Sequence, residues 1–389
     1  MAICLSSRFK NKNNTRAEWY VARDRRYWTE AIGRSHSDLH RKPDGLAPPV
    51  SVFLIGRKRF LSTSLPLVQL FLMENYSAPP ITPELAGSLM PMRPDDSFKG
   101  TFGKALVVAG SRKYTGAAKL AIQAALRSGA GLVFAAIPES IHAPLAASIS
   151  EAIWLLLPEK DGAITAEGRS ACVEEKEAGQ ASEEKAGLFP TEGKDAVLVG
   201  PGLNQTEGTQ AFLLGLLEHL CEVAPDLPLV VDADALNILS QQPDWHRLLP
   251  NRIVLTPHEM EFSRLTGLSL SEIHSNRLKL ATTYAQKWQL TLILKGPNTL
   301  VASHDGDCRV LPFANSVLAH GGSGDVLAGL IVGLLAQGLS PFDAATLAVW
   351  LHARSAELAL AEVGHPAATL PSDIIRHIGK AMSSLSKSQ

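Results

Sequence analysis

The sequence predicts an α/β protein in which helices cover both faces of a central, mostly parallel β-sheet. From residue 104 onward, short and continuously apolar runs recur, as expected for strands that are buried on both faces. Each run is followed by Gly, Pro or Asp and then by a helical pattern. This alternation of strand and helix is typical of a three-layer sandwich.

The first predicted strand covers residues 105–109, and an Ala-rich helix over residues 117–127 follows it. Further strands are expected at residues 132–137, 196–199, 229–231, 252–255 and 292–294. Two short runs around a polar turn predict a hairpin, at residues 298–302 and 308–311. Helices are expected near the carboxyl terminus at residues 326–337, 341–362 and 372–382. The polar stretch 159–195 predicts a surface excursion with a short helix.

Composition limits the classes of function. The 389 residues are 46% hydrophobic and 19% charged, which fits one large or two ordinary globular domains. A formal net charge of −1 gives no reason to expect nucleic acid as a partner. The four cysteines form no CxxC pair, so a reducing, cytoplasmic compartment is expected and a metal cluster is not. The apolar run 60–73 is too short to span a bilayer and contains Pro66, so no membrane is expected.

The first 78 residues differ from the rest of the chain. Residues 1–72 carry 13 Lys/Arg and 5 Asp/Glu, and no period of 2 or 3.6 runs through them. Three interpretations are open: a disordered basic tail, a targeting presequence, or an extension upstream of a true start at Met73. The acidic residues and Pro-rich patch argue against a presequence, and we favour the extension. We therefore expect one catalytic domain over residues 79–389.

The most informative loop covers residues 315–325, directly before an apolar helix. Its glycines, Gly321, Gly322 and Gly324, let the backbone approach a ligand closely around Ser323. The helix start offers unpaired N–H groups and a positive dipole end, which suit a transferring phosphoryl group. Asp325 is unfavourable beside such an anion unless it accepts a proton from a hydroxyl nucleophile. The alternative is that Asp325 is an ordinary helix cap.

Two further loops follow predicted strands, at the edge where ligands bind in a parallel sheet. Gly200-Pro201-Gly202 forms a stiff loop whose backbone can lie against a ligand, although a plain turn is an equal alternative. Asp232 and Asp234 follow the strand at residues 229–231, and paired carboxylates can hold Mg²⁺. Alternatively, Asp234 caps the next helix.

His258 and Glu261 follow the strand at residues 252–255, on one face of a helix that Thr256 or Pro257 opens. A lone His is more often structural than catalytic, but this one lies beside acids, and Glu261 could help to organise a metal–water network. Lys295 begins a Lys-Gly-Pro-Asn-Thr segment that can bring an ammonium and backbone groups to nucleotide phosphates. Taken singly, that segment is a β-turn with an exposed lysine.

Small residues at positions 116–118 permit either close approach of a substrate or tight helix packing. GxxxxGK[ST] does not occur, which excludes a Walker-type phosphate loop. GxGxxG, GxSxG and HExxH do not occur either. Gly-Ser-Gly-Asp is therefore a different way of placing a phosphoryl group.

Taken together and in this order, the motifs resemble those of the ADP/ATP-dependent NAD(P)H-hydrate dehydratases, a branch of the ribokinase-like superfamily. The likeness covers about residues 80–385 and includes Lys99-Gly100-Thr101-Phe102-Gly103, Thr115-Gly116-Ala117-Ala118 and Gly322-Ser323-Gly324-Asp325. Further matches are Gly200-Pro201-Gly202, Asp232-Ala233-Asp234, Thr256-Pro257-His258 and Lys295-Gly296-Pro297-Asn298-Thr299. The resemblance implies a ribokinase-like three-layer sandwich.

The resemblance also implies a repair reaction. Such enzymes phosphorylate the 6-hydroxyl of hydrated NADH or NADPH (NADHX, NADPHX) and then eliminate phosphate. Asp325 would be the base, within an anion hole formed by Gly321, Gly322, Ser323 and Gly324. Ala117, Gly202, His258 and Asp325 would contact the hydrate. The adenine nucleotide would contact Lys295, Gly296, Pro297, Asn298, Thr299 and Gly324. Mg²⁺ would bridge its phosphates, with help from Glu261.

Several further expectations rest on the resemblance to the family and not on individual residues of this chain. Many members carry an amino-terminal epimerase domain, and residues 1–78 show no such pattern, so we expect the dehydratase alone, acting on the S epimer. ADP is the expected donor, giving AMP and phosphate, with ATP as the alternative. Members are commonly tetramers, so a homotetramer is expected. The rival interpretation is a ribokinase-like kinase of a vitamin precursor alcohol, which shares Gly-Ser-Gly-Asp but often has Asn-x-x-Glu where this chain has His258-Glu259-Met260-Glu261.

Overall fold

The computed structural model describes residues 78–169, 191 and 193–385. The chain divides into two units, residues 1–71 and 72–389, and the first lies wholly outside the described residues. The expected basic extension over residues 1–78 lies outside them too, apart from Ala78, and stays a prediction.

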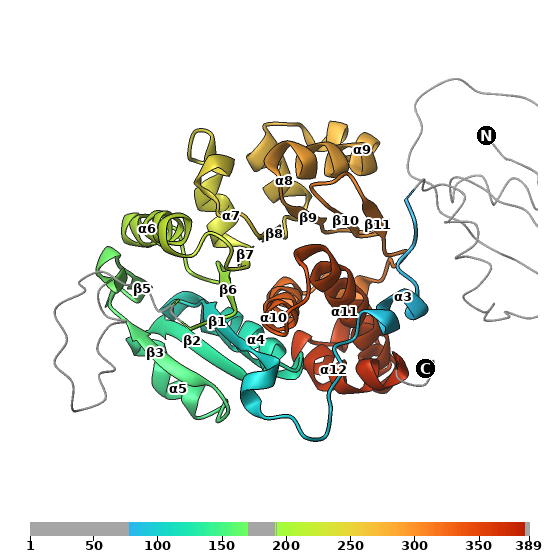
Figure 1. Ribbon diagram of the computed structural model, residues 1–389, viewed down its shortest axis with the longest axis horizontal. Helices are drawn as coiled ribbons and strands as arrows, with labels where there is room; N and C mark the ends of the chain where they lie inside the picture. Colours follow the sequence, from blue (N-terminus) through green and yellow to red (C-terminus); the bar gives the residue numbers. More distant parts are fainter. Residues whose placement is uncertain (1–77, 170–190, 192, 386–389) are drawn as a thin grey trace, which may run out of the picture. The chain divides into compact units, whose positions relative to one another are not determined.

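A nine-stranded sheet forms the middle of the described part of the chain, in the order β11-β10-β9-β8-β7-β6-β1-β2-β3 (Figure 1). Seven of its strands are parallel: β1 (Lys104–Val108), β2 (Leu132–Pro138), β3 (Ile153–Leu157), β6 (Ala196–Val199), β7 (Leu229–Val231), β8 (Ile253–Leu255) and β9 (Thr291–Leu294). The predicted hairpin, β10 (Leu300–Ala302) and β11 (Cys308–Val310), adds two antiparallel strands to β9.

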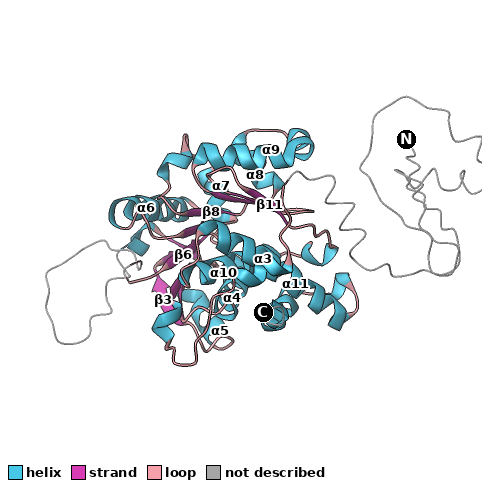
Figure 2. Ribbon diagram, turned by 45° about the vertical axis from the view of Figure 1, so that its right-hand side comes forward, coloured by secondary structure: helices cyan, strands magenta, loops and turns pink. Residues whose placement is uncertain are grey.

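Both faces of the central strands are buried, because successive residues of these strands enter different cores. In β1, Ala105 and Val107 pack on one side and Leu106 and Val108 on the other. The first side holds α4 (Thr115–Arg127), α10 (Ser323–Ala336), α11 (Pro341–Val363) and α12 (Pro371–Leu385). The second side holds α6 (Glu207–Val223), α7 (Asp234–Leu239), α8 (Glu259–Thr266) and α9 (Leu270–Trp288). Figures 1 and 2 show these helices on the two sides of the sheet, which confirms the predicted three-layer fold.

Two elements depart from the prediction. β3 was not expected, and it leads into a small hairpin of β4 (Glu159–Lys160) and β5 (Ala163–Ile164) instead of a helix. Within the predicted excursion 159–195, the described residues form this hairpin and a 3₁₀ turn, Ala166–Arg169. Strand-then-helix alternation was the signal used for the other strands, and β3 lacks it.

The strand order reverses between β1 and β6, because the chain builds β2 and β3 on one side of β1 and β6 to β9 on the other. Loops that leave neighbouring strands at such a point diverge to opposite faces, and ligands bind there. The loops after β1 and β6 touch where they begin, since the amide of Gly110 donates to the carbonyl of Pro201 at 2.8 Å, and they then lead to α4 and α6 on opposite faces.

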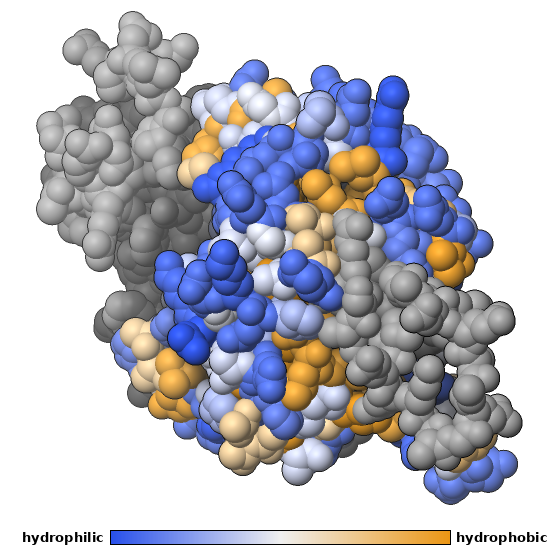
Figure 3. All heavy atoms as spheres, turned by 90° about the vertical axis from the view of Figure 1, so that its left-hand side faces the viewer, coloured by the Kyte–Doolittle hydropathy of each residue, from blue (hydrophilic) through white to orange (hydrophobic). Residues whose placement is uncertain are grey.

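No helix among residues 78–169 and 193–385 is long and apolar enough to cross a membrane. On the face drawn in Figure 3, hydrophilic side chains predominate and hydrophobic ones form smaller patches between them.

Candidate active site

The loops after β7, β8 and β9 bring three predicted site segments to one edge of the sheet. Asp232 follows β7, Thr256 follows β8 and Lys295 follows β9. Because these strands are parallel neighbours, side chains 63 positions apart in the sequence meet: the Lys295 Nζ lies 2.9 Å from Asp232 Oδ1.

Lys295 is the cationic centre of the site. Its Nζ also lies 3.8 Å from Glu261 Oε2, and the Thr256 hydroxyl donates to Asp232 Oδ1 at 2.6 Å. Burial would lower the pKa of Lys295, but the carboxylates of Asp232 and Glu261 outweigh burial and raise it. The ammonium therefore stays charged and offsets the buried acids around it.

Asp325 lies at the start of α10, beside this centre. Gly322 has a φ of 98°, a left-handed conformation that glycine adopts readily and that turns the chain into the helix. A Cβ on Gly324 would lie 3.4 Å from Lys295 Nζ, so the helix start and the ammonium are adjacent. Burial and the nearby Asp232 raise the pKa of Asp325 to about 7, against the attraction of Lys295. A carboxyl with such a pKa can both take and release a proton near neutral pH.

The structure does not place Asp325 or Asp234 at helix caps. Gly322 occupies the N-cap position of α10, and Asp325 is the third residue of that helix. Ala233 precedes α7, and Asp234 instead accepts from the amide of Asn204 and the side chain of Gln205, each at 2.9 Å. The capping alternative is therefore wrong for both aspartates.

His258 caps α8, which begins at Glu259 and not at Thr256 or Pro257 as expected. The His258 Nδ1 accepts from the amides of Met260 at 3.2 Å and Glu261 at 3.3 Å, and Glu261 Oε2 accepts from the His258 amide at 2.8 Å. Burial and Lys295 lower the pKa of His258, which suits a neutral ring with Nδ1 as acceptor. The ring is half exposed, and its Nε2 lies 3.4 Å from Glu261 Oε1.

Glu261 is 5% exposed, and burial raises its pKa to about 7 despite Lys295. Asp232 and Asp234 accept hydrogen bonds from different donors, Thr256 and Asn204. Among the described residues, no three His, Cys, Asp or Glu side chains are grouped as metal ligands. A Mg²⁺ ion here would need phosphate oxygens and water as its other ligands, and the role of Glu261 stays a prediction.

Gly202 and Ala117 lie against each other at the point where the strand order reverses. A Cβ on Gly202 would meet Ala117 Cβ at 2.8 Å and Tyr114 Cβ at 2.7 Å, and the Ser111 hydroxyl donates to the Gly202 carbonyl at 2.8 Å. The two predicted substrate contacts therefore lie side by side, one at the start of α4 and one in the loop after β6.

Gly202→Ala is expected to destabilise the fold by about 2–4 kcal/mol and to raise KM for the substrate, because φ is +63° and the added methyl has no room. The matched control is Gly267→Ala, where φ is +75° but no atom lies within 4 Å of the added Cβ. The control should cost only about 1 kcal/mol, without a change in KM. Thermal unfolding and steady-state kinetics of both variants test this, and equal effects would contradict it.

The predicted nucleotide segment, residues 295–299, is a turn between β9 and β10. Gly296 and Pro297 are exposed, and the amide of Lys295 donates to the carbonyl of Pro257 at 2.9 Å. The Thr299 hydroxyl donates to the Gly296 carbonyl at 3.0 Å, which closes the turn. The Lys295 side chain points back to Asp232, whereas Gly296 and Pro297 face the solvent.

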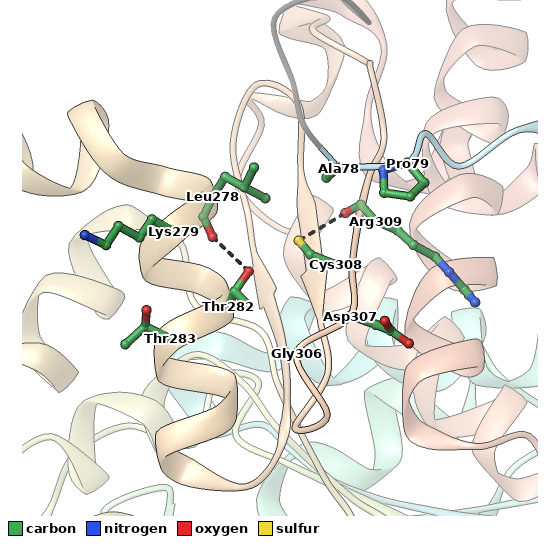
Figure 4. A pocket seen from close by; sticks show the side chains of 10 residues that line it. All are labelled: Ala78, Pro79, Leu278, Lys279, Thr282, Thr283, Gly306, Asp307, Cys308 and Arg309. Atoms are coloured by element: carbon green, nitrogen blue, oxygen red, sulfur yellow. Dashed lines mark hydrogen bonds between the residues drawn. The ribbon is translucent and has the colours of Figure 1, made fainter.

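A separate pocket of about 730 Å³ lies between α9, β11 and residues 78–79 (Figure 4). Leu278 and Thr282 of α9 face Cys308 of β11 across it. Burial raises the pKa of the Cys308 thiol to about 11, so it stays protonated. None of the predicted site residues lines this pocket.

The fold, with its Gly-rich helix start at the carboxyl edge of the sheet, defines a ribokinase-like protein. A crystal structure of a ribokinase-like superfamily protein from Enterococcus faecalis matches with a TM-score of 0.62 and 25% identity, over 79% of this chain and 96% of its own. Within that class, the model of the NAD(P)H-hydrate dehydratase family matches residues 105–380, and the chain belongs to this family.

The ADP-dependent (S)-NAD(P)H-hydrate dehydratase of Bacillus subtilis is 35% identical over 306 residues, which are 77% of this chain and 97% of the relative. The crystal structure of the ADP/ATP-dependent NAD(P)H-hydrate dehydratase from B. subtilis, co-crystallised with ATP and Mg²⁺, matches at 30% identity with a TM-score of 0.63, over 79% of this chain and 99% of its own. The resemblance deduced from the motifs is thus confirmed.

The bifunctional NAD(P)H-hydrate repair enzyme Nnr of Moorella thermoacetica is 35% identical over 326 residues, 83% of this chain but 57% of the relative. The chain spans about half the length of the bifunctional relatives that it matches.

Proposed function

We propose that this protein is an ADP-dependent dehydratase of the S epimer of hydrated NADH and NADPH. The observation that supports this most strongly is the Asp325 carboxyl, with a pKa raised to about 7, at a helix start that is adjacent to the Lys295 ammonium. The family to which the chain belongs and the ADP-dependent relative of B. subtilis support the substrate and the donor.

The site accounts for the steps as follows. Asp325 takes the proton of the 6-hydroxyl as that oxygen attacks the terminal phosphorus of ADP, which releases AMP. The N–H groups of residues 321–324 and the positive end of α10 offset the charge on the transferring group. The C6–O bond then breaks and phosphate leaves, while the proton on C5 is lost and the C5–C6 double bond returns.

Other residues bind and orient the two substrates. Ala117, Gly202 and His258 hold the hydrated dinucleotide, and residues 295–299 with Gly324 hold the adenine nucleotide. Mg²⁺, when bound, would neutralise the donor phosphates, and the buried carboxyl of Glu261 would help to hold it. We also propose a cytoplasmic homotetramer, which rests on the family alone.

A small-molecule kinase of a vitamin precursor alcohol is the competing function. His258-Glu259-Met260-Glu261 at the start of α8 favours the dehydratase over the Asn-x-x-Glu of many such kinases. Incubation with the separated S and R hydrates of NADH, with ADP and with ATP in parallel, distinguishes the two. We expect NADH only from the S hydrate, faster with ADP. No NADH from either hydrate, together with phosphorylation of a vitamin alcohol, would contradict the proposal.

The rate of repair is expected to rise with pH and to level off above about pH 7, because the pKa of Asp325 is raised to about 7 and the base must be ionised. Glu261 has a similar pKa, so the pH profile of Glu261→Gln is the control. This variant should keep the rise, even at a lower maximum. A rate that does not change between about pH 5 and pH 9 would contradict the role of Asp325.

A further inference from the structure

Arg277 of α9 is a buried cation that no step above uses. Its side chain is 11% exposed, and it follows Asn276, whose φ of −137° breaks the regular helix. A buried arginine is unfavourable unless its donors find acceptors, so its partners indicate what it does.

The guanidinium joins two segments of the site. Nη1 contacts the carboxylate of Glu259, the first residue of α8, next to His258. Nη2 donates to the carbonyl of Leu294 at 3.2 Å, the last residue of β9 before Lys295. A Cβ on Gly296 would lie 2.5 Å from Nη1, so the guanidinium also packs directly against the nucleotide segment.

A planar guanidinium has several N–H donors in fixed directions, so it can donate to both of these acceptors at once. A lysine ammonium does not have this geometry. Glu259 is held from its other side by His274, whose Nδ1 lies 3.2 Å away. The start of α8 and the turn after β9 are thereby fixed to each other through one side chain.

We propose that Arg277 is a positioning residue for nucleotide binding: it holds residues 295–299 in the conformation that receives the adenine nucleotide, against the start of α8. This inference rests on the proposed role of residues 295–299, and the measurement below does not depend on hydrate repair.

The test is the affinity of the full chain for ADP, measured by calorimetry, with kcat and KM measured beside it. Arg277→Met should raise both Kd and KM for ADP about tenfold, the effect of one lost hydrogen bond to a charged group, while kcat changes far less. Arg277→Lys keeps the charge opposite Glu259 and is expected to fold, but it should weaken ADP binding in the same direction.

The matched control is Arg309→Met. Arg309 is also partly buried and ion-paired, with Nη1 3.3 Å from Asp343 Oδ1 and 3.0 Å from the Thr346 hydroxyl, but both of these partners belong to α11 and neither belongs to the nucleotide segment. It should lower the Tm without changing Kd for ADP. Wild-type affinity in both Arg277 variants, or an equal loss in Arg309→Met, would overturn the inference. A wild-type protein that binds ADP but repairs no hydrate would overturn the proposed function alone.

Discussion

Asp325→Asn is expected to lower the rate of hydrate repair by about 10²–10⁴-fold, the range for loss of a general base. ADP should still bind with wild-type affinity, because the amides of residues 321–324 and the Lys295 ammonium remain. Steady-state kinetics and calorimetry measure the two effects separately. Full turnover in this variant would show that Asp325 is not the base.

The same variant is expected to be more stable than the wild type at pH 8. The pKa of Asp325 in the fold, about 7, lies above its ordinary value, so the ionised carboxyl destabilises the native state. This cost is absent below about pH 4, grows as the pH rises, and is complete above about pH 7, where it is on the order of 2–4 kcal/mol. Thermal unfolding of both proteins at pH 4 and pH 8 tests this. A stability difference that does not grow with pH would contradict it.

Lys295→Met is expected to abolish ADP binding and to destabilise the fold by about 3–5 kcal/mol at pH 8. The reason is that Asp232, 1% exposed, and Glu261, 5% exposed, would lose the cation between them. Chemical denaturation measures the change in the free energy of unfolding. Lys279→Met, on the exposed side of α9, is the control and should unfold as the wild type does.

A double variant separates the ion pair from the general effect of the substitution. Asp232→Asn removes the buried charge but keeps an oxygen that accepts from Thr256. Lys295→Met with Asp232→Asn should therefore be more stable than Lys295→Met alone, by about 1–3 kcal/mol. If the two effects simply add, Asp232 is not the group that Lys295 stabilises.

The sequence predicted the layered fold because β-strands buried on both faces are continuously apolar. The Leu-Val-Val of β7 has this pattern, and all three residues are buried. β3 is an edge strand with one exposed leucine and no helix after it, so neither signal applied. The loops of the site could be predicted because the carboxyl ends of parallel strands meet at one edge.

Contacts within the site were less accessible to sequence reasoning. Asp232 and Asp234 look like a pair in the sequence, but they follow a buried strand and turn to different partners. The pairing of Lys295 with Asp232 depends on which strands are neighbours. Arg277 lies within a helical pattern, where no turn or glycine marks it, and only the packing of α9 brings it to Leu294.

The most direct test mixes the wild-type protein with ADP and the S hydrate of NADH, and quantifies NADH, AMP and phosphate in the same sample. We expect equal amounts of all three, because phosphorylation of the 6-hydroxyl is followed by elimination at the same site. AMP without NADH, with a phosphorylated hydrate or another phosphorylated alcohol as the product, would show that the Asp325 site transfers a phosphoryl group but does not dehydrate.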